Sequence, residues 1–389
     1  MVETQGVASG QFSGLLLTKL RLPSLPPSIL PRGPLLDRLD QALEYKLTLL
    51  SAPAGFGKTT LMRSWVAQHQ DQCAISWLAL DTGDNDAIRF WRYLTMACQR
   101  FEAAADASIP TFGRSTLEFL RHAQGLSLTG PQYLSFETAQ AGLVNDLAQL
   151  SCPCVLVLED YHVLTEASIH EVMAMLIEYL PPAIHVVLLS RGDLPLPLAR
   201  LRAQGELLEL RAPDLRFTLA ETRLLLQQSV PFPLSEEMVA RLQARTEGWI
   251  VGLTLVVLAL RERSSEQEST HFLTTFSGRY RRILEYLVSD VLGTQPEALQ
   301  LFLLQTSGLR RLSGSLCDAV TGRTDSDLVL EQLWNARACF WMRWMVLENG
   351  IAIIPSLLRL CSRRYVGGLE RICSMHVLVR RVSGTSSMI

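Results

Sequence analysis

Residues 46–61 read KLTLLSAPAGFGKTTL, and this stretch decides the fold of the chain. Lys46 to Ala52 is a short, largely apolar run that is typical of a buried parallel strand. Two glycines, Gly55 and Gly57, then turn the chain, and the residues from Thr59 onward have helical spacing. A strand, a glycine-containing turn and a helix that opens on Gly-Lys-Thr together predict a phosphate-binding loop.

The chemistry of this loop requires these residue types. Its backbone N–H groups and the helix N-terminus attract phosphate oxygens, and glycine permits a close approach that a side chain would block. Lys58 is expected to reach the β- and γ-phosphates, and the hydroxyl of Thr59 to bind Mg²⁺. Ala52 stands where the full pattern begins with glycine. The expected cofactors are ATP or ADP with Mg²⁺, and the loop residues expected to bind them are Ala54, Gly55, Phe56, Gly57, Lys58, Thr59 and Thr60.

Two acidic residues follow a second buried strand. Val155 to Leu158 is apolar and leads directly into Glu159 and Asp160, which places both carboxylates at the carboxyl edge of a parallel sheet. We expect Glu159 to hold the metal, directly or through water, and Asp160 to orient the attacking water as a catalytic residue beside Lys58. The alternative is that these acids only begin a solvated loop.

An arginine leaves a third predicted strand. Residues 184–190 are apolar except for His185 and Ser190, and Arg191 follows. A guanidinium at this edge can pair with a γ-phosphate, so Arg191 is a third candidate catalytic residue. An ordinary surface arginine is the alternative.

Strands alternate with helices up to about residue 215, and only helices are predicted beyond it. The alternation predicts an α/β P-loop NTPase fold, with a mostly parallel sheet and helices on both faces. An all-α helical domain and a winged-helix-like module are expected to follow. The predicted strands are 46–52, 74–80, 154–158, 184–190 and 207–210, and Thr218 and Ser235 are expected to cap the first two helices after them.

Composition excludes several classes of protein. The formal net charge of -2 gives no indication of a nucleic-acid or anionic-membrane partner. No apolar run reaches the roughly 18 residues that a membrane-spanning helix needs. No signal peptide is seen, and the scattered cysteines predict reduced structural thiols in a cytoplasmic protein.

At these motifs the chain resembles the signal-transduction ATPases with numerous domains (STAND), an AAA-like class. Within this class it resembles the maltose-regulon-activator (MalT-like) type of the LuxR family of transcriptional regulators. The resemblance covers about residues 18–338. Besides the phosphate loop, it rests on Thr18-Lys-Leu-Arg-Leu-Pro23, Leu156-Val-Leu-Glu-Asp-Tyr-His162, Ser190-Arg191, Glu247-Gly-Trp249 and Phe302-Leu-Leu-Gln-Thr-Ser307.

The resemblance implies that ATP or ADP is held as an on/off switch between a nucleotide-binding domain, a helical lid and a winged helix. It places Arg32 near the adenine and Gly248-Trp249 in the lid. It also implies self-association in the ATP state, with no membrane contact and no direct DNA binding by this chain. The expected divisions are a disordered start (1–17), an entry segment with the first helix (18–44), the nucleotide-binding domain (45–215), the lid (216–265), the winged-helix-like domain (270–338) and a tail (339–389).

The tail changes character from Cys339 onward. Its residues fit no continuation of the family pattern, and another reading frame of residues 339–355 permits a family-like phrase. We therefore hypothesise a frameshift near codon 339 that produces an aberrant, arginine-rich tail. A nucleic-acid-binding arm is the alternative.

Three functions are compatible with the sequence. The first is a switch module that lacks the family's sensor repeats and DNA-binding domain and hydrolyses ATP slowly. The second is a turnover ATPase that acts on another substrate, although the sequence offers no second catalytic group. The third is a truncated fragment that binds nucleotide and transmits no signal.

Overall fold

The computed structural model describes residues 15–25, 29–104, 113, 116–118, 120, 132–261, 296–306, 309 and 312–335. These described residues form two compact units. The first comprises those up to Ala52 together with Gly57–Leu215, and the second comprises Pro53–Phe56 together with those from Arg216 onward. The predicted helix at 280–292 and the tail at 339–389 lie outside the described residues.

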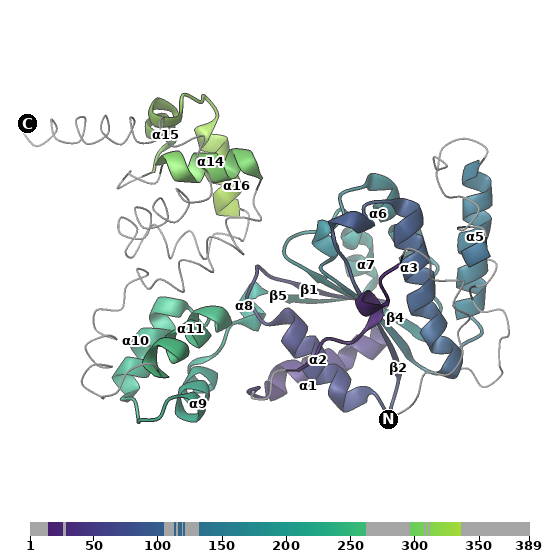
Figure 1. Ribbon diagram of the computed structural model, residues 1–389, viewed down its shortest axis with the longest axis horizontal. Helices are drawn as coiled ribbons and strands as arrows, with labels where there is room; N and C mark the ends of the chain where they lie inside the picture. Colours follow the sequence, from purple (N-terminus) through teal and green to yellow (C-terminus); the bar gives the residue numbers. More distant parts are fainter. Residues whose placement is uncertain are drawn as a thin grey trace, which may run out of the picture. The chain divides into compact units, whose positions relative to one another are not determined.

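The first unit is built on a five-stranded sheet with the order β2-β3-β4-β1-β5 (Figure 1). Every neighbouring pair in it is parallel, so the predicted parallel α/β fold is confirmed. The strands are β1 (Leu47–Ser51), β2 (Ala74–Ala79), β3 (Cys154–Glu159), β4 (Ile184–Ser190) and β5 (Leu207–Arg211).

Helices cover both faces of this sheet, which explains why its central strands are largely apolar. All residues of β1 and β4 are buried. Figure 1 shows α1 (Gly33–Asp40) and α2 (Lys58–His69) on one face, and α3 (Ala87–Gln99), α6 (Ala167–Glu178) and α7 (Leu198–Gln204) on the other. The first unit also contains α5 (Gln132–Leu147) and α8 (Ala212–Leu215).

Alternate residues of each strand serve the two faces. Leu49 of β1 and Leu188 of β4 belong to the large core cluster that includes Trp91 of α3 and Met173 of α6. On the other face, Trp65 of α2 is fully buried. The same strands therefore contribute side chains to a hydrophobic core on each face of the sheet.

The entry segment departs from prediction at its C-terminal end. The five prolines of residues 22–34 predict no helix there, yet α1 begins at Gly33, because proline is compatible with the first turn of a helix. Leu16 and Leu17 belong to the range 1–17 that is expected to be a disordered start, and the structure describes both residues. The N–H of Leu16 donates a 2.8 Å hydrogen bond to the hydroxyl of Tyr93, and a 3₁₀ turn covers Leu17–Leu20.

The second unit is helical where the structure describes it. Its first helices are α9 (Leu219–Ser229), α10 (Glu236–Thr246) and α11 (Ile250–Arg261). Thr218 and Ser235 accept hydrogen bonds from N–H groups of the first turns of α9 and α10, so both predicted N-caps are confirmed. Further along the chain are α14 (Glu297–Thr306), α15 (Gly314–Thr321) and α16 (Ser326–Asn335).

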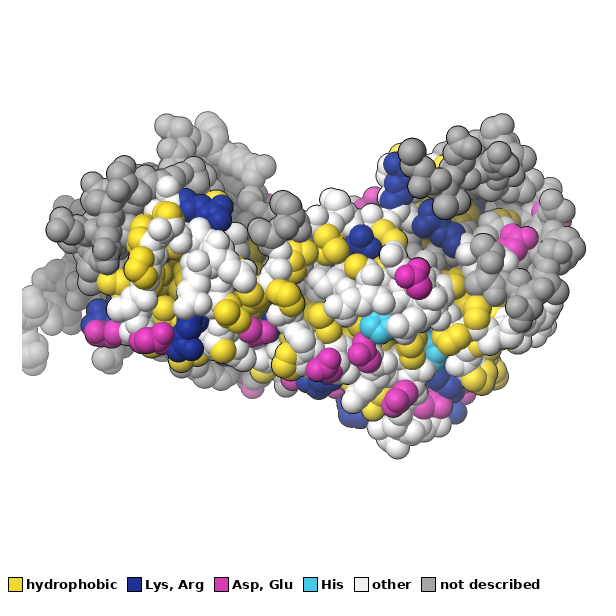
Figure 2. Space-filling view, turned by 90° about the horizontal axis from the view of Figure 1, so that it is seen from below, with side chains coloured by type: hydrophobic (Ala, Val, Ile, Leu, Met, Phe, Trp, Pro, Cys, Tyr) yellow, Lys and Arg dark blue, Asp and Glu magenta, His cyan; other side chains and the backbone are white. Residues whose placement is uncertain are grey.

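The described surface carries charges of both signs. On the face shown in Figure 2, acidic and basic side chains are interspersed with hydrophobic ones. Among the described residues, no helix is both long and apolar enough to cross a membrane.

A buried ion pair fastens the entry segment to the loop after β2. Lys19 is 8% exposed, and its Nζ lies 2.5 Å from Oδ2 of the fully buried Asp84 and 2.7 Å from Oδ2 of Asp81. Nε of Arg89 lies 3.3 Å from the other oxygen of Asp84. The short Thr-Lys-Leu motif is therefore an anchor of the first unit.

Replacing Lys19 with methionine is expected to lower the free energy of unfolding by about 3 kcal/mol, because the carboxylate of Asp84 would stay buried with less compensation. Urea denaturation measures this loss. Lys46→Met is the control, since Lys46 and Glu206 form a 2.9 Å pair in which each side chain is 30% exposed. It should cost less than about 1 kcal/mol. Equal losses for the two variants would contradict the anchoring role.

Candidate nucleotide-binding site

The carboxyl ends of three adjacent strands bring the predicted phosphate-site residues of the first unit together. β4 lies between β1 and β3, so Arg191 leaves the sheet between the phosphate loop and the two acids. Ligands of open α/β sheets bind outside the carboxyl ends of the strands. The strand order therefore places Lys58, Arg191 and Glu159 at one edge of the sheet.

Lys58 is the first residue of α2 and is almost wholly buried. Gly57, at the helix N-cap, has the left-handed φ of 76° that glycine adopts without strain. Nζ of Lys58 donates a 2.6 Å hydrogen bond to the carbonyl of Ala52, so the side chain folds back toward the end of β1. Burial lowers the pKa of Lys58 to about 8, Asp160 and Glu159 oppose this effect, and Arg191 adds to it. An anion bound beside Lys58 would therefore stabilise the protonated, charged form of this side chain.

Glu159 is held by two hydrogen bonds. The hydroxyl of Thr59 donates to its Oε1 at 2.5 Å, and the indole Nε1–H of Trp77 donates to its Oε2 at 3.0 Å. The first bond links the start of α2 to the end of β3. Trp77 was not among the predicted site residues, although a buried indole N–H on a neighbouring strand needs an acceptor.

Asp160 has a strained backbone and two close basic neighbours. Its φ of 57° and ψ of 37° are left-handed, which is uncommon for a residue other than glycine. Its Oδ1 lies 4.0 Å from Nε of Arg191 and 3.7 Å from Nδ1 of His162. Burial lowers the pKa of His162 to about 4, although Asp160 opposes this, so the imidazole is neutral at pH 7.

The other predicted nucleotide residues have different surroundings. Arg32 is buried, and its Nη1 donates a 2.7 Å hydrogen bond to the carbonyl of Leu215. The backbone carbonyl of Thr60 accepts a hydrogen bond from the side-chain hydroxyl of Ser64. Ala54, Gly55 and Phe56 belong to the second unit, where carbonyls of the loop accept hydrogen bonds from residues near the start of α11. The predicted roles of these residues toward a nucleotide stay predictions.

The oxygen atoms of Thr59 and Glu159 fit Mg²⁺. Magnesium prefers hard oxygen ligands, keeps several waters and takes only one or two carboxylates beside substrate phosphates. A hydroxyl that donates its proton to Glu159 still has lone pairs for a metal. Among the described residues no group of three or more His, Cys, Asp or Glu side chains forms a protein-only metal site. The oxygen atoms of Thr59 and Glu159 therefore suit a metal ion that binds together with a nucleotide, whose phosphates and water molecules would supply the other ligands.

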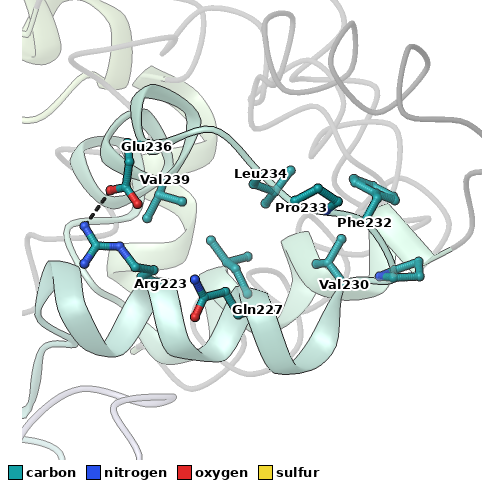
Figure 3. A pocket seen from close by; sticks show the side chains of 10 residues that line it. Arg223, Gln227, Val230, Phe232, Pro233, Leu234, Glu236 and Val239 are labelled. Atoms are coloured by element: carbon teal, nitrogen blue, oxygen red, sulfur yellow. Dashed lines mark hydrogen bonds and ion pairs between the residues drawn. The ribbon is translucent and has the colours of Figure 1, made fainter.

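A pocket in the second unit has different chemistry. It has a volume of about 290 Å³ and lies between α9 and α10 (Figure 3). Val230, Phe232 and Leu234 give it an apolar lining, and an ion pair between Arg223 and Glu236 lies at one end. None of the predicted phosphate-site residues lines it, so it is not the candidate nucleotide site.

The sheet order and the Gly-Lys-Thr turn at the start of α2 define the fold of the first unit as that of a P-loop ATPase. In sequence the chain is similar to proteins of the MalT type. Residues 288–341 match the MalT winged helix domain family, which confirms the predicted winged helix. This match overlaps the described helices α14, α15 and α16.

Two curated relatives show the extent of this similarity. The HTH-type transcriptional regulator MalT of Yersinia pestis (strain Pestoides F) is 32% identical over 320 residues, which cover 82% of this chain and 33% of the relative. MalT of Yersinia enterocolitica serotype O:8 / biotype 1B has the same identity and coverage. The chain thus spans about a third of the length of the curated relatives it matches.

A solved structure, the Walker-type ATPase of Pyrococcus abyssi, is similar with a TM-score of 0.49 and 15% sequence identity. The alignment covers 88% of this chain and 100% of that chain.

The left-handed backbone of Asp160 leads to a stability prediction. Asp160→Gly and Asp160→Ala both remove the carboxylate, but only glycine adopts a φ of 57° without a steric cost. The glycine variant should therefore be more stable than the alanine variant by about 1 kcal/mol. Urea denaturation of the two variants measures the difference. An alanine variant as stable as the glycine variant would show that the backbone there is relaxed.

Proposed function

We propose that this chain binds ATP with Mg²⁺ at the phosphate loop and serves as the nucleotide switch of a MalT-like transcriptional regulator in the cytoplasm. The observation that carries the proposal is a buried Lys58 at the start of α2, together with the hydrogen bond from Thr59 to Glu159. Sequence similarity to the Yersinia regulators supports the regulatory assignment.

Binding would use the first turn of α2. The backbone N–H groups of this turn and the ammonium group of Lys58 would face the β- and γ-phosphates. The bond from Lys58 to the carbonyl of Ala52 would be exchanged for stronger, charge-assisted bonds to phosphate. Thr59 and Glu159 would hold Mg²⁺, which supplies positive charge that neutralises the phosphate oxygens.

Hydrolysis would use Asp160 and Arg191. Asp160 would accept a proton from the attacking water as the water oxygen bonds to the γ-phosphorus. The bond from that phosphorus to the bridging oxygen breaks, which releases ADP and phosphate. Arg191 would offset the charge on the γ-phosphate, and its place beside Asp160 supports this role.

A switch requires that nucleotide favours one conformation by a few kcal/mol, and slow hydrolysis is then sufficient to reset it. Self-association in the ATP state is the proposed output. The chain covers 33% of the length of these regulators. The proposal therefore does not extend to the functions of the rest of the longer proteins.

Lys58→Ala is expected to weaken ATP binding about 30- to 1000-fold, because the charge-assisted contacts to the phosphates are lost. Isothermal titration with ATP and with ADP in the presence of Mg²⁺ measures the change. Lys46→Ala is the matched control: Lys46 precedes β1 and pairs with Glu206, so its loss should leave affinity unchanged. Wild-type affinity in the Lys58 variant would refute the proposed site.

ATP and ADP should give different oligomeric states if the chain is a switch. Light scattering of the wild type is expected to show a larger mass with ATP than with ADP, and no such difference for Lys58→Ala. Binding without any change in mass would favour a fragment that transmits no signal. Hydrolysis well above one turnover per second, without partners, would favour a turnover ATPase instead.

A further inference from the structure

The tip of the phosphate loop is hydrogen-bonded to the start of α11 within the second unit. Nε1–H of Trp249 donates to the carbonyl of Ala54 at 3.2 Å. The backbone N–H of Val251 donates to the carbonyl of Gly55 at 3.3 Å. Two successive carbonyls of the loop thus have donors from one short segment, and Trp249 is only 3% exposed.

Peptide geometry gives these bonds a consequence for the N–H groups of the loop. In a planar trans peptide the C=O and N–H bonds point in opposite directions. Since the carbonyls of Ala54 and Gly55 point to Trp249 and Val251, the N–H groups of Gly55 and Phe56 point away from them. These are N–H groups of the kind that a phosphate loop presents to its anion.

Gly55 fits this arrangement only without a side chain. Its φ of +77° is left-handed, and a Cβ there would lie 2.7 Å from Cγ2 of Val251 and 2.9 Å from Nε1 of Trp249. The close approach of α11 to the loop therefore depends on glycine. This contact gives a steric reason for glycine at position 55, in addition to the conformational freedom that a tight loop needs.

The position of Trp249 is fixed by the turn before it. Glu247 and Gly248 both have left-handed φ angles, of 46° and 74°, and the carbonyl of Gly248 accepts a hydrogen bond from the N–H of Phe217. Glu247 also pairs with Arg216 at 3.0 Å. A Cβ on Gly248 would lie 2.3 Å from the carbonyl oxygen of Phe217, so this turn admits no larger residue.

We infer that Trp249 and the N–H of Val251 are positioning groups for nucleotide binding, which hold the carbonyls of Ala54 and Gly55 so that the following N–H groups face the phosphates. The inference rests on the proposed function and extends it by assigning this role to the Gly-Trp-Ile-Val segment. Nucleotide and the first turn of α11 are then coupled through the loop: each stabilises the loop conformation that the other needs.

Trp249→Phe tests the inference, because it keeps an aromatic ring and removes the N–H donor. ATP affinity should fall about three- to tenfold, the range for one lost hydrogen bond. Val251→Pro is the second variant: it removes the other donor in the first turn of α11, where proline is tolerated, and should have a similar effect. Trp65→Phe is the matched control, since it loses a 2.9 Å indole bond to Asp40 in the first unit and should bind ATP normally.

A spectroscopic measurement separates positioning from simple stability. In protein labelled with ¹⁵N-tryptophan, the indole resonance that disappears in Trp249→Phe belongs to Trp249. ATP with Mg²⁺ should shift this resonance in the wild type and not in Lys58→Ala.

Two results would overturn the inference in distinguishable ways. If Trp249→Phe and Val251→Pro bind ATP as the wild type does while Lys58→Ala does not, the positioning role fails and the nucleotide site stands. If the wild type binds no ATP, the nucleotide site and the positioning role fail together.

Discussion

The parallel alignment of β1, β4 and β3 is the constraint on which the candidate site depends. Because the three strands run the same way and are neighbours, their carboxyl ends present the phosphate loop, Arg191 and the two acids at one edge. The hydrogen bond from Thr59 to Glu159 joins residues that are 100 positions apart in the chain, and this alignment brings them together. The buried apolar residues that form these strands thus also determine where the candidate site residues lie.

The sequence was sufficient for the strands and for the phosphate loop. Largely apolar runs such as Ile184–Ser190 identify strands buried on both faces, and the Gly-Lys-Thr turn identifies the loop. The order of the strands was not predictable from these runs, and neither was the helix Leu198–Gln204, which is too short to show a period. Trp77 was missed because its bond to Glu159 joins residues 82 positions apart, through a strand register that no local pattern encodes.

The neighbouring acids Glu159 and Asp160 show how adjacent residues acquire different surroundings. Glu159 ends β3 with both carboxylate oxygens hydrogen-bonded, to Thr59 and to Trp77. Asp160 leaves the strand with left-handed backbone angles and has basic groups near it at 3.7 and 4.0 Å. The backbone conformation changes between the two residues. As a result, Glu159 is fixed by two hydrogen bonds, whereas the carboxylate of Asp160 has only longer contacts to Arg191 and His162.

The four residues Pro53–Phe56 belong by their contacts to the second unit, although the residues on both sides of them in the chain belong to the first. The backbone therefore passes from one unit to the other at three places, after residues 52, 56 and 215. A single cleavage after Leu215 would leave every residue of the first unit in one fragment, whereas the second unit would be separated from Pro53–Phe56. A fragment that stops at Leu215 would keep Ala54 and Gly55 but lose the donors that their carbonyls use.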